Sequence, residues 1–144
     1  MAQERLLMSK KFKSILLIDD NAADNRYNQI ILEEMNIVDT IEVADNAPDA
    51  LKLLDDDGHQ QPELILLDIN MPKMNGWEFL EAYKKMHLDE RSKKIVVVLT
   101  TSMNPEDKKK ADEISGVAEF NIKPLTPGML EKIIEKYGTG GGDK

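Results

Sequence analysis

The sequence has no cysteine among its 144 residues, which excludes disulfides, thiolate catalysis and cysteine-rich metal sites. It also lacks any apolar run near the ~20 residues that cross a bilayer. Its start, MAQERLLMSKKFK, has neither the apolar core nor the cleavage site of a signal peptide. We therefore expect a cytoplasmic protein that does not engage membranes. Positive charge is scarce as well: 19 basic against 27 acidic residues give a net charge of −8, which disfavours nucleic acid as a partner.

What the sequence does contain is a regular alternation of apolar patterns. Five strand-like runs are SILLID (14–19), TIEVAD (40–45), ELILLDI (63–69), KIVVVLT (94–100) and AEFNIK (118–123). Helical spacing of apolar residues lies between and after them, as in Tyr27, Ile30, Ile31 and Met35. This spacing predicts helices in 23–35, 48–54, 77–84 and 129–137. Asn104-Pro105 predicts the start of one more helix after the fourth strand.

Strictly alternating strands and helices predict an α/β protein with a flavodoxin-like, doubly wound, five-stranded parallel sheet and helices on both faces. The first, third and fourth strands are almost continuously apolar, so we expect them to be central. The second alternates, with Ile41 and Val43 on one face against Glu42 and Ala44 on the other, and the fifth alternates too. Alternation is typical of edge strands, so the predicted order is 2-1-3-4-5. We expect one domain over 13–137, an N-terminal extension over 1–12 and a flexible tail over 138–144.

Polar residues gather at the carboxyl ends of the predicted strands, where ligands bind in such sheets. Asp19 and Asp20 end the first strand, Asp68 lies at the end of the third, Thr100 ends the fourth and Lys123 the fifth. Three crowded carboxylates repel one another, and a hard divalent cation relieves that repulsion. We expect Mg²⁺, with Mn²⁺ as an alternative ion.

The expected ligands are Asp20 and Asp68, Asp19 directly or through water, and a backbone carbonyl near Asn70. A carboxylate such as Asp68 can itself act as a nucleophile and form an aspartyl phosphate. Lys123 and the Thr100 hydroxyl would then stabilise the charge of the phosphoryl oxygens.

Four motifs in order carry a family resemblance: IDDN (18–21), LLDINMPKMNG (66–76), VVVLTTS (96–102) and IKP (122–124). Together they resemble the CheY-like receiver domain of two-component response regulators, of the single-domain type, over about 13–137. The resemblance implies Mg²⁺-dependent phosphorylation of Asp68, with Asp19 and Asp20 holding the metal.

The resemblance also implies roles for residues that the pattern alone does not assign. Thr100 and Phe120 would form a conformational switch, and Asn70, Thr101 and Ser102 would tune the rate of dephosphorylation. Lys123 would stabilise the phosphoryl group, and its peptide bond to Pro124 would be cis. Two residues depart from the family's common pattern. Thr101 is β-branched where a small residue is frequent, which could narrow access to the site, and Phe120 lacks the hydroxyl of a tyrosine.

Partners follow from the resemblance in the same way. A sensor histidine kinase or phosphotransfer protein would supply the phosphoryl group. The chain would catalyse only its own phosphorylation and dephosphorylation, so we do not expect a turnover enzyme. With no output domain in these residues, a changed face would contact an unknown downstream protein, with the chain a monomer or a phosphorylation-dependent dimer.

Three other functions fit parts of the pattern. An FMN-binding module would share the fold, but the acidic loop after the first strand repels a phosphate. A phosphatase with an aspartate nucleophile would normally place that nucleophile at the end of the first strand, with a second acid two residues on, whereas Asp19 and Asp20 are adjacent. The third alternative is a pseudo-receiver, an interaction module that is never phosphorylated.

Overall fold

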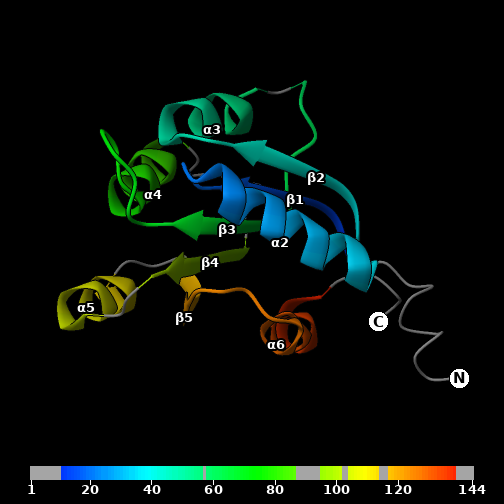
Figure 1. The fold of residues 1–144 in the computed structure, drawn as a ribbon. Helices are drawn as coiled ribbons and strands as arrows, with labels where there is room; N and C mark the ends of the chain where they lie inside the picture. Colours follow the sequence, from blue (N-terminus) through cyan, green and yellow to red (C-terminus); the bar gives the residue numbers. More distant parts are fainter. Residues whose placement is uncertain (1–10, 57, 87–94, 102–103, 114–116, 139–144) are drawn as a thin grey trace, which may run out of the picture.

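Five parallel strands form a single sheet in the order β2-β1-β3-β4-β5 (Figure 1). The structure is a computed structural model and describes residues 11–56, 58–86, 95–101, 104–113 and 117–138. The strands are β1 Phe12–Ile18, β2 Val38–Ala44, β3 Leu64–Asp68, β4 Ile95–Thr100 and β5 Val117–Ile122. The predicted fold class and strand order are confirmed. The predicted N-terminal extension and C-terminal tail fall largely on 1–10 and 139–144, which lie outside the described residues.

Five helices are described: α2 Ala22–Met35, α3 Ala47–Leu54, α4 Gly76–Met86, α5 Pro105–Glu113 and α6 Pro127–Tyr137. Each begins after a side chain that accepts a hydrogen bond from a backbone N–H of its first turn; the caps are Asn21, Asn46, Asn75, Asn104 and Thr126. These caps satisfy backbone N–H donors that the first turn of each helix leaves without an intrahelical partner. Within the described ranges, no helix is long and apolar enough to span a membrane.

Two apolar clusters cover the two faces of the sheet. One joins Leu16, Ile65 and Val98 to α3 and α4, with Ala111 of α5 packed against it. The other joins Leu17, Leu66 and Val97 to Leu32 of α2 and to Leu130 and Ile133 of α6. Neighbouring residues of a strand thus belong to opposite clusters, because successive side chains of a β-strand point to opposite faces of the sheet. Figure 1 shows the resulting three layers, with α2 and α6 on one side of the sheet and α3, α4 and α5 on the other.

The burial of β1, β3 and β4 agrees with their continuously apolar sequence, but two predicted patterns differ. The helix over 23–35 forms, yet Tyr27 and Ile30 are 42% and 37% exposed, whereas Asn25, Asn28 and Leu32 are buried. In β2, Val43 is 40% exposed and Ala44 is buried against α3. At an edge strand the small side chain lies under the helix, where space is short, and the larger one faces outward.

Candidate functional site

Three carboxylates meet at the carboxyl ends of β1 and β3. Asp68 is the last residue of β3, and Asp19 and Asp20 directly follow β1. Each offers an oxygen, and these atoms all lie within 4.8 Å of one another. Asp19 and Asp68 are buried, whereas Asp20 is exposed. The parallel pairing of β1 with β3 produces this cluster, because it brings Ile18 next to Leu67, one residue before each acid.

Asp19 is fixed by hydrogen bonds on its backbone and on its side chain. Its N–H donates to the carbonyl of Ala44 at 3.2 Å, and its Oδ1 accepts from the N–H of Asn21 at 2.9 Å. The Asn25 amide, buried on α2, donates to the Asp19 carbonyl at 2.8 Å. The acidic loop is therefore held between the edge strand and the first turns of α2. The sequence does not predict this role of Asn25, because the residue lies in a polar stretch typical of a solvent-exposed helix start.

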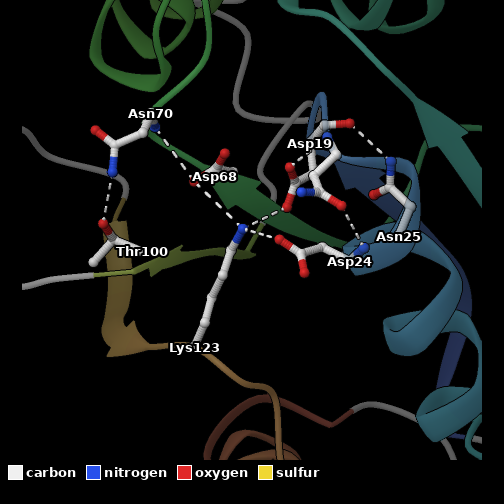
Figure 2. Close-up of polar contacts among 8 residues, drawn as sticks. Asp19, Asp24, Asn25, Asp68, Asn70, Thr100 and Lys123 are labelled. Carbon is white, nitrogen blue, oxygen red and sulfur yellow. Dashed lines mark hydrogen bonds and ion pairs between the residues drawn. The ribbon is translucent and has the colours of Figure 1, made fainter.

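Lys123 reaches into this cluster from the segment after β5. Its Nζ donates to Asp19 Oδ2 at 2.8 Å and to Asp24 Oδ2 at 2.7 Å, and it lies 3.7 Å from Asp68 Oδ1. Figure 2 shows the ammonium between Asp68 on one side and the two other acids on the other. Burial would lower the pKa of Lys123, but the hydrogen bonds to Asp19 and Asp24 and the nearby charges raise it overall. The lysine therefore stays charged. The Lys123–Pro124 peptide bond is cis.

Asp68 is the acid whose environment most opposes its charge. Burial is the main cause, and the Asp19 charge adds to it, so the pKa of Asp68 rises from 3.8 to about 6. The Lys123 charge and the N–H of Asn70, 3.3 Å from Asp68 Oδ1, act in the opposite direction. At pH 7 the side chain is still mainly a carboxylate. It is therefore a desolvated anion at the rim of an apolar sheet, as a nucleophile requires.

Thr100 lies across the site from the acid pair, at the end of β4. It is fully buried, and its hydroxyl accepts a hydrogen bond from the Asn70 amide at 3.1 Å. Figure 2 shows this bond on the side of Asp68 away from Asp19. Asn70 thus contacts Asp68 through its backbone and Thr100 through its side chain.

Thr101, Ser102 and Phe120 are the other residues that the resemblance assigned to the site. Thr101 is exposed, and Ser102 lies outside the described residues. Phe120 is half-buried, with its ring centroid 6.2 Å from that of Trp77. Trp77 on α4 donates through Nε1 to Asp107 of α5 at 3.1 Å. The aromatic residue proposed as a switch therefore packs where α4, α5 and β5 meet.

The arrangement of side chains suits a hard divalent cation. Two buried carboxylates and one exposed carboxylate can supply oxygen ligands and leave positions for water, which is how Mg²⁺ is usually held. The only cation within reach among the described residues is Lys123, and it already contacts Asp19. Asp19, Asp20 and Asp68 therefore fit the predicted metal, because three carboxylates against one ammonium leave two negative charges for a divalent cation to offset.

Known proteins resemble this chain over most of its length. The family model of the response regulator receiver domain matches residues 15–135. A hybrid signal transduction histidine kinase C from Dictyostelium discoideum is 32% identical over 127 residues, which make up 85% of this chain and 10% of that kinase. The chain thus spans a tenth of the length of this relative.

Two solved structures extend the similarity to the fold. A two-component response regulator from Cytophaga hutchinsonii is 32% identical, with a TM-score of 0.79 over 89% of this chain and 98% of that one. The phosphorylated cyanobacterial phytochrome response regulator RcpA is 30% identical, with a TM-score of 0.68 over 86% of this chain and 89% of that one. With its motifs, sheet order and matching family model, this chain belongs to the response regulator receiver domain family, whose members are signalling modules rather than conventional enzymes.

Proposed function

We propose that this chain is a phosphoacceptor response regulator that takes a phosphoryl group on Asp68 in an Mg²⁺-dependent reaction. The observation that carries the proposal is the position of Asp68. It is buried, within 4.8 Å of the acid pair and 3.7 Å from the Lys123 ammonium. RcpA, 30% identical, is described as phosphorylated, which supports the same chemistry here.

In the reaction, an Asp68 carboxylate oxygen attacks the donor's phosphorus. The new oxygen–phosphorus bond forms as the bond to the donor breaks, and the bonding electron pair leaves with the donor. That donor is a phosphohistidine of a sensor histidine kinase or phosphotransfer protein. Dephosphorylation is hydrolysis: a water oxygen bonds to phosphorus as the bond to the Asp68 oxygen breaks. The Asp68 carboxylate is restored, and the phosphate leaves with the proton from water. These two reactions of the chain on itself are the only catalysis we assign.

Charge stabilisation falls to the residues around Asp68. Asp19, Asp20, Asp68 and the backbone carbonyl of Asn70 would hold Mg²⁺, or Mn²⁺ in its place. Such an ion, when bound, offsets the charge of the transferred phosphoryl group. Lys123 supplies a positive charge 3.7 Å from Asp68 Oδ1, and the burial of both side chains limits screening of that charge by bulk water.

The switch begins at Thr100. In the state described, its hydroxyl is engaged by the Asn70 amide. A phosphoryl group on Asp68 offers a stronger, charged acceptor to that hydroxyl. We expect Thr100 to turn toward it and Phe120 to move in turn, with Asn70, Thr101 and Ser102 tuning how fast the phosphoryl group is lost.

The interaction face, formed by α5, β5 and α6, would carry the signal to an unknown downstream protein. It contains a hollow of about 280 Å³ between β5 and α6, lined by residues that include Glu119, Asn121 and Lys132. Ile122, on the same strand, is 43% exposed. We expect a cytoplasmic protein without nucleic-acid or membrane partners, and a monomer or a dimer that forms on phosphorylation.

Beryllofluoride is a stable mimic of the phosphoryl group, so it tests this proposal without a phosphoryl donor. Trp77 is the only tryptophan of the chain and adjoins Phe120, so its fluorescence reports the switch. We expect a saturable change with Mg²⁺ and beryllofluoride together, and none in EDTA or with Asp68→Asn. If the wild-type protein binds neither Mg²⁺ nor beryllofluoride, the pseudo-receiver alternative replaces this proposal.

A further inference from the structure

Lys123 has a second acidic partner that the proposed reaction does not use. Asp24 lies in the first turn of α2, and its Oδ2 accepts from Lys123 Nζ at 2.7 Å, the shortest of the lysine's three contacts with acids. The Lys123 side chain is 13% exposed and the Asp24 side chain 39%. The pair is therefore partly shielded from water, which makes it stronger than an ordinary surface ion pair.

Helix capping does not explain this contact. Asp24, Asp49 and Glu78 occupy the same place relative to a capping asparagine, and the backbone N–H of each donates to that cap. In α3, the Asp49 carboxylate turns back and accepts from the Asn46 amide at 3.0 Å. In α4, Glu78 likewise accepts from the N–H of Asn75 at 2.9 Å. Asp24 instead extends its carboxylate across the site to Lys123, as Figure 2 shows.

We propose that Asp24 is a positioning residue that holds the Lys123 ammonium where a phosphoryl group on Asp68 would need it; this inference rests on the proposed function. A lysine stem is flexible, and its three N–H donors can be shared among acceptors. Asp24 and Asp19 take two of them. At 3.7 Å from Asp68 Oδ1, the ammonium is too far to bond that oxygen well. It is, however, within reach of a phosphoryl oxygen attached there.

Asp24 matters most when the site is in use. Asp19 is also an expected metal ligand, so its oxygens are shared between the metal and the lysine. Asp24 is not an expected metal ligand, so its carboxylate can remain bonded to Lys123 when the metal is present. Protein kinases use the same device, in which a carboxylate on a helix orients the lysine that contacts the phosphates. A helix-borne acid at this rim therefore fixes the lysine without occupying the phosphoryl position.

The test compares Asp24→Asn with Asp49→Asn, which removes the equivalent acid of α3 far from Lys123. The initial rate of phosphorylation by acetyl phosphate is followed by intact-protein mass at saturating Mg²⁺. We expect Asp24→Asn to react about fivefold more slowly than the wild type, the effect of losing one partly shielded ion pair. Asp49→Asn should react at the wild-type rate, and Asp24→Glu, which keeps the charge, should recover part of the loss.

A double-mutant cycle separates positioning from a general structural effect. In a Lys123→Ala background, Asp24→Asn should slow the reaction no further, because there is no ammonium left to hold. A second measurement needs neither metal nor phosphoryl donor. Lysine side chains are acylated in EDTA, and the rate at each lysine is measured by peptide mass spectrometry. Lys123 should react faster in Asp24→Asn than in the wild type, whereas the exposed Lys52 should not change.

The outcomes distinguish this inference from the function on which it rests. If the wild type is phosphorylated on Asp68 and Asp24→Asn reacts as fast or faster, the positioning role is wrong and the proposed function stands. Additive effects of Asp24→Asn and Lys123→Ala on the rate also overturn the positioning role. If the wild type acquires no phosphoryl group and binds no beryllofluoride, both proposals fail together.

Discussion

Asp68 has to carry a negative charge in a place that favours its neutral form. Its pKa is raised to about 6, first by burial and then by Asp19. A group that binds its proton more tightly in the folded state makes the free energy of unfolding fall as pH rises between its unfolded and folded pKa values. Ionisation of Asp68 therefore lowers the free energy of unfolding progressively from about pH 4 to about pH 6, and the full loss is present at pH 7.

Asp68→Asn should remove that loss. In EDTA at pH 7, we expect the variant to be more stable than the wild type by on the order of 2 kcal/mol. The difference should shrink as the pH falls toward 4 and vanish below the unfolded pKa of 3.8, where Asp68 is protonated in both states. Urea unfolding of both proteins at several pH values measures it. A constant difference across this range would contradict the assigned environment of Asp68.

Thr100 and Thr101 form a natural pair for testing the switch. Thr100 is buried and bonded to the Asn70 amide, whereas Thr101 is exposed. Thr100→Val should still bind beryllofluoride but lose most of the Trp77 fluorescence change, and its unfolding free energy should fall by about 1 kcal/mol. Thr101→Val should retain the fluorescence change. A full response from Thr100→Val would place the start of the switch elsewhere.

Individual site residues were predictable from the sequence to the extent that they interrupt apolar strands. Asp19 and Asp68 end apolar runs, so their position at a strand end is visible without a structure. Asp24 and Asn25 lie among other polar residues at a helix start and carry no such signal. Their roles depend on Lys123 and on the Asp19 carbonyl, which only the folded chain brings near.

The segment between β3 and α4 is the element that fixes Asp68 relative to the rest of the site. Gly76 begins α4, and its N–H donates to the Ile69 carbonyl at 3.1 Å. A Cβ at Gly76 would lie 2.7 Å from Ile69 Cα and 3.0 Å from the Asp68 carbonyl oxygen. No side chain fits between this helix start and the end of β3.

Gly76→Ala should therefore destabilise the protein by roughly 2 kcal/mol, because backbone atoms must move to relieve the overlap. Gly128→Ala is the matched control, since its Cβ would meet only Thr126 Oγ1 at 3.8 Å. In the first turn of α6, that alanine should leave stability unchanged or raise it. Urea unfolding of both variants provides the comparison. Equal stability of the two would show that the segment accommodates a side chain.

At the level of elements, sequence periodicity predicted helices and strands better than it predicted their buried faces. Apolar spacing located α2, yet its face toward the sheet carries Asn25, Asn28 and Leu32. In β2, Val43 faces outward while Ala44 is covered by α3. Both departures arise where packing space and hydrogen-bond partners, rather than hydrophobicity, decide which side chain turns inward.

For the whole molecule, the crowded acids imply that folding and metal binding are linked. A ligand that binds only the folded state adds about 1.4 kcal/mol to stability for each tenfold rise above its dissociation constant. We expect Mg²⁺ to raise the unfolding temperature of the wild type relative to EDTA. Asp20→Asn should lose much of this gain, whereas Asp39→Asn, an exposed acid away from the site, should keep it. An unfolding temperature unaffected by Mg²⁺ would contradict the metal site.

The fold was predictable because several independent signals agree. Continuous apolar runs identified β1, β3 and β4 as central, and strict alternation of strands and helices required a parallel sheet. The strand order then placed the acids, Thr100 and Lys123 at one rim. The distances among them depend on the path of the β3–α4 segment and on side-chain hydrogen bonds, which the sequence pattern does not specify.

The central claim is that Asp68 accepts a phosphoryl group with the help of a divalent cation. Its most direct test is the mass of the intact protein after incubation with acetyl phosphate and Mg²⁺, alongside samples in EDTA and of Asp68→Asn. We predict one added phosphoryl group in the first sample and none in the two controls. An adduct that persists in Asp68→Asn, or a wild-type protein that gains none and also fails to bind beryllofluoride, would contradict the claim.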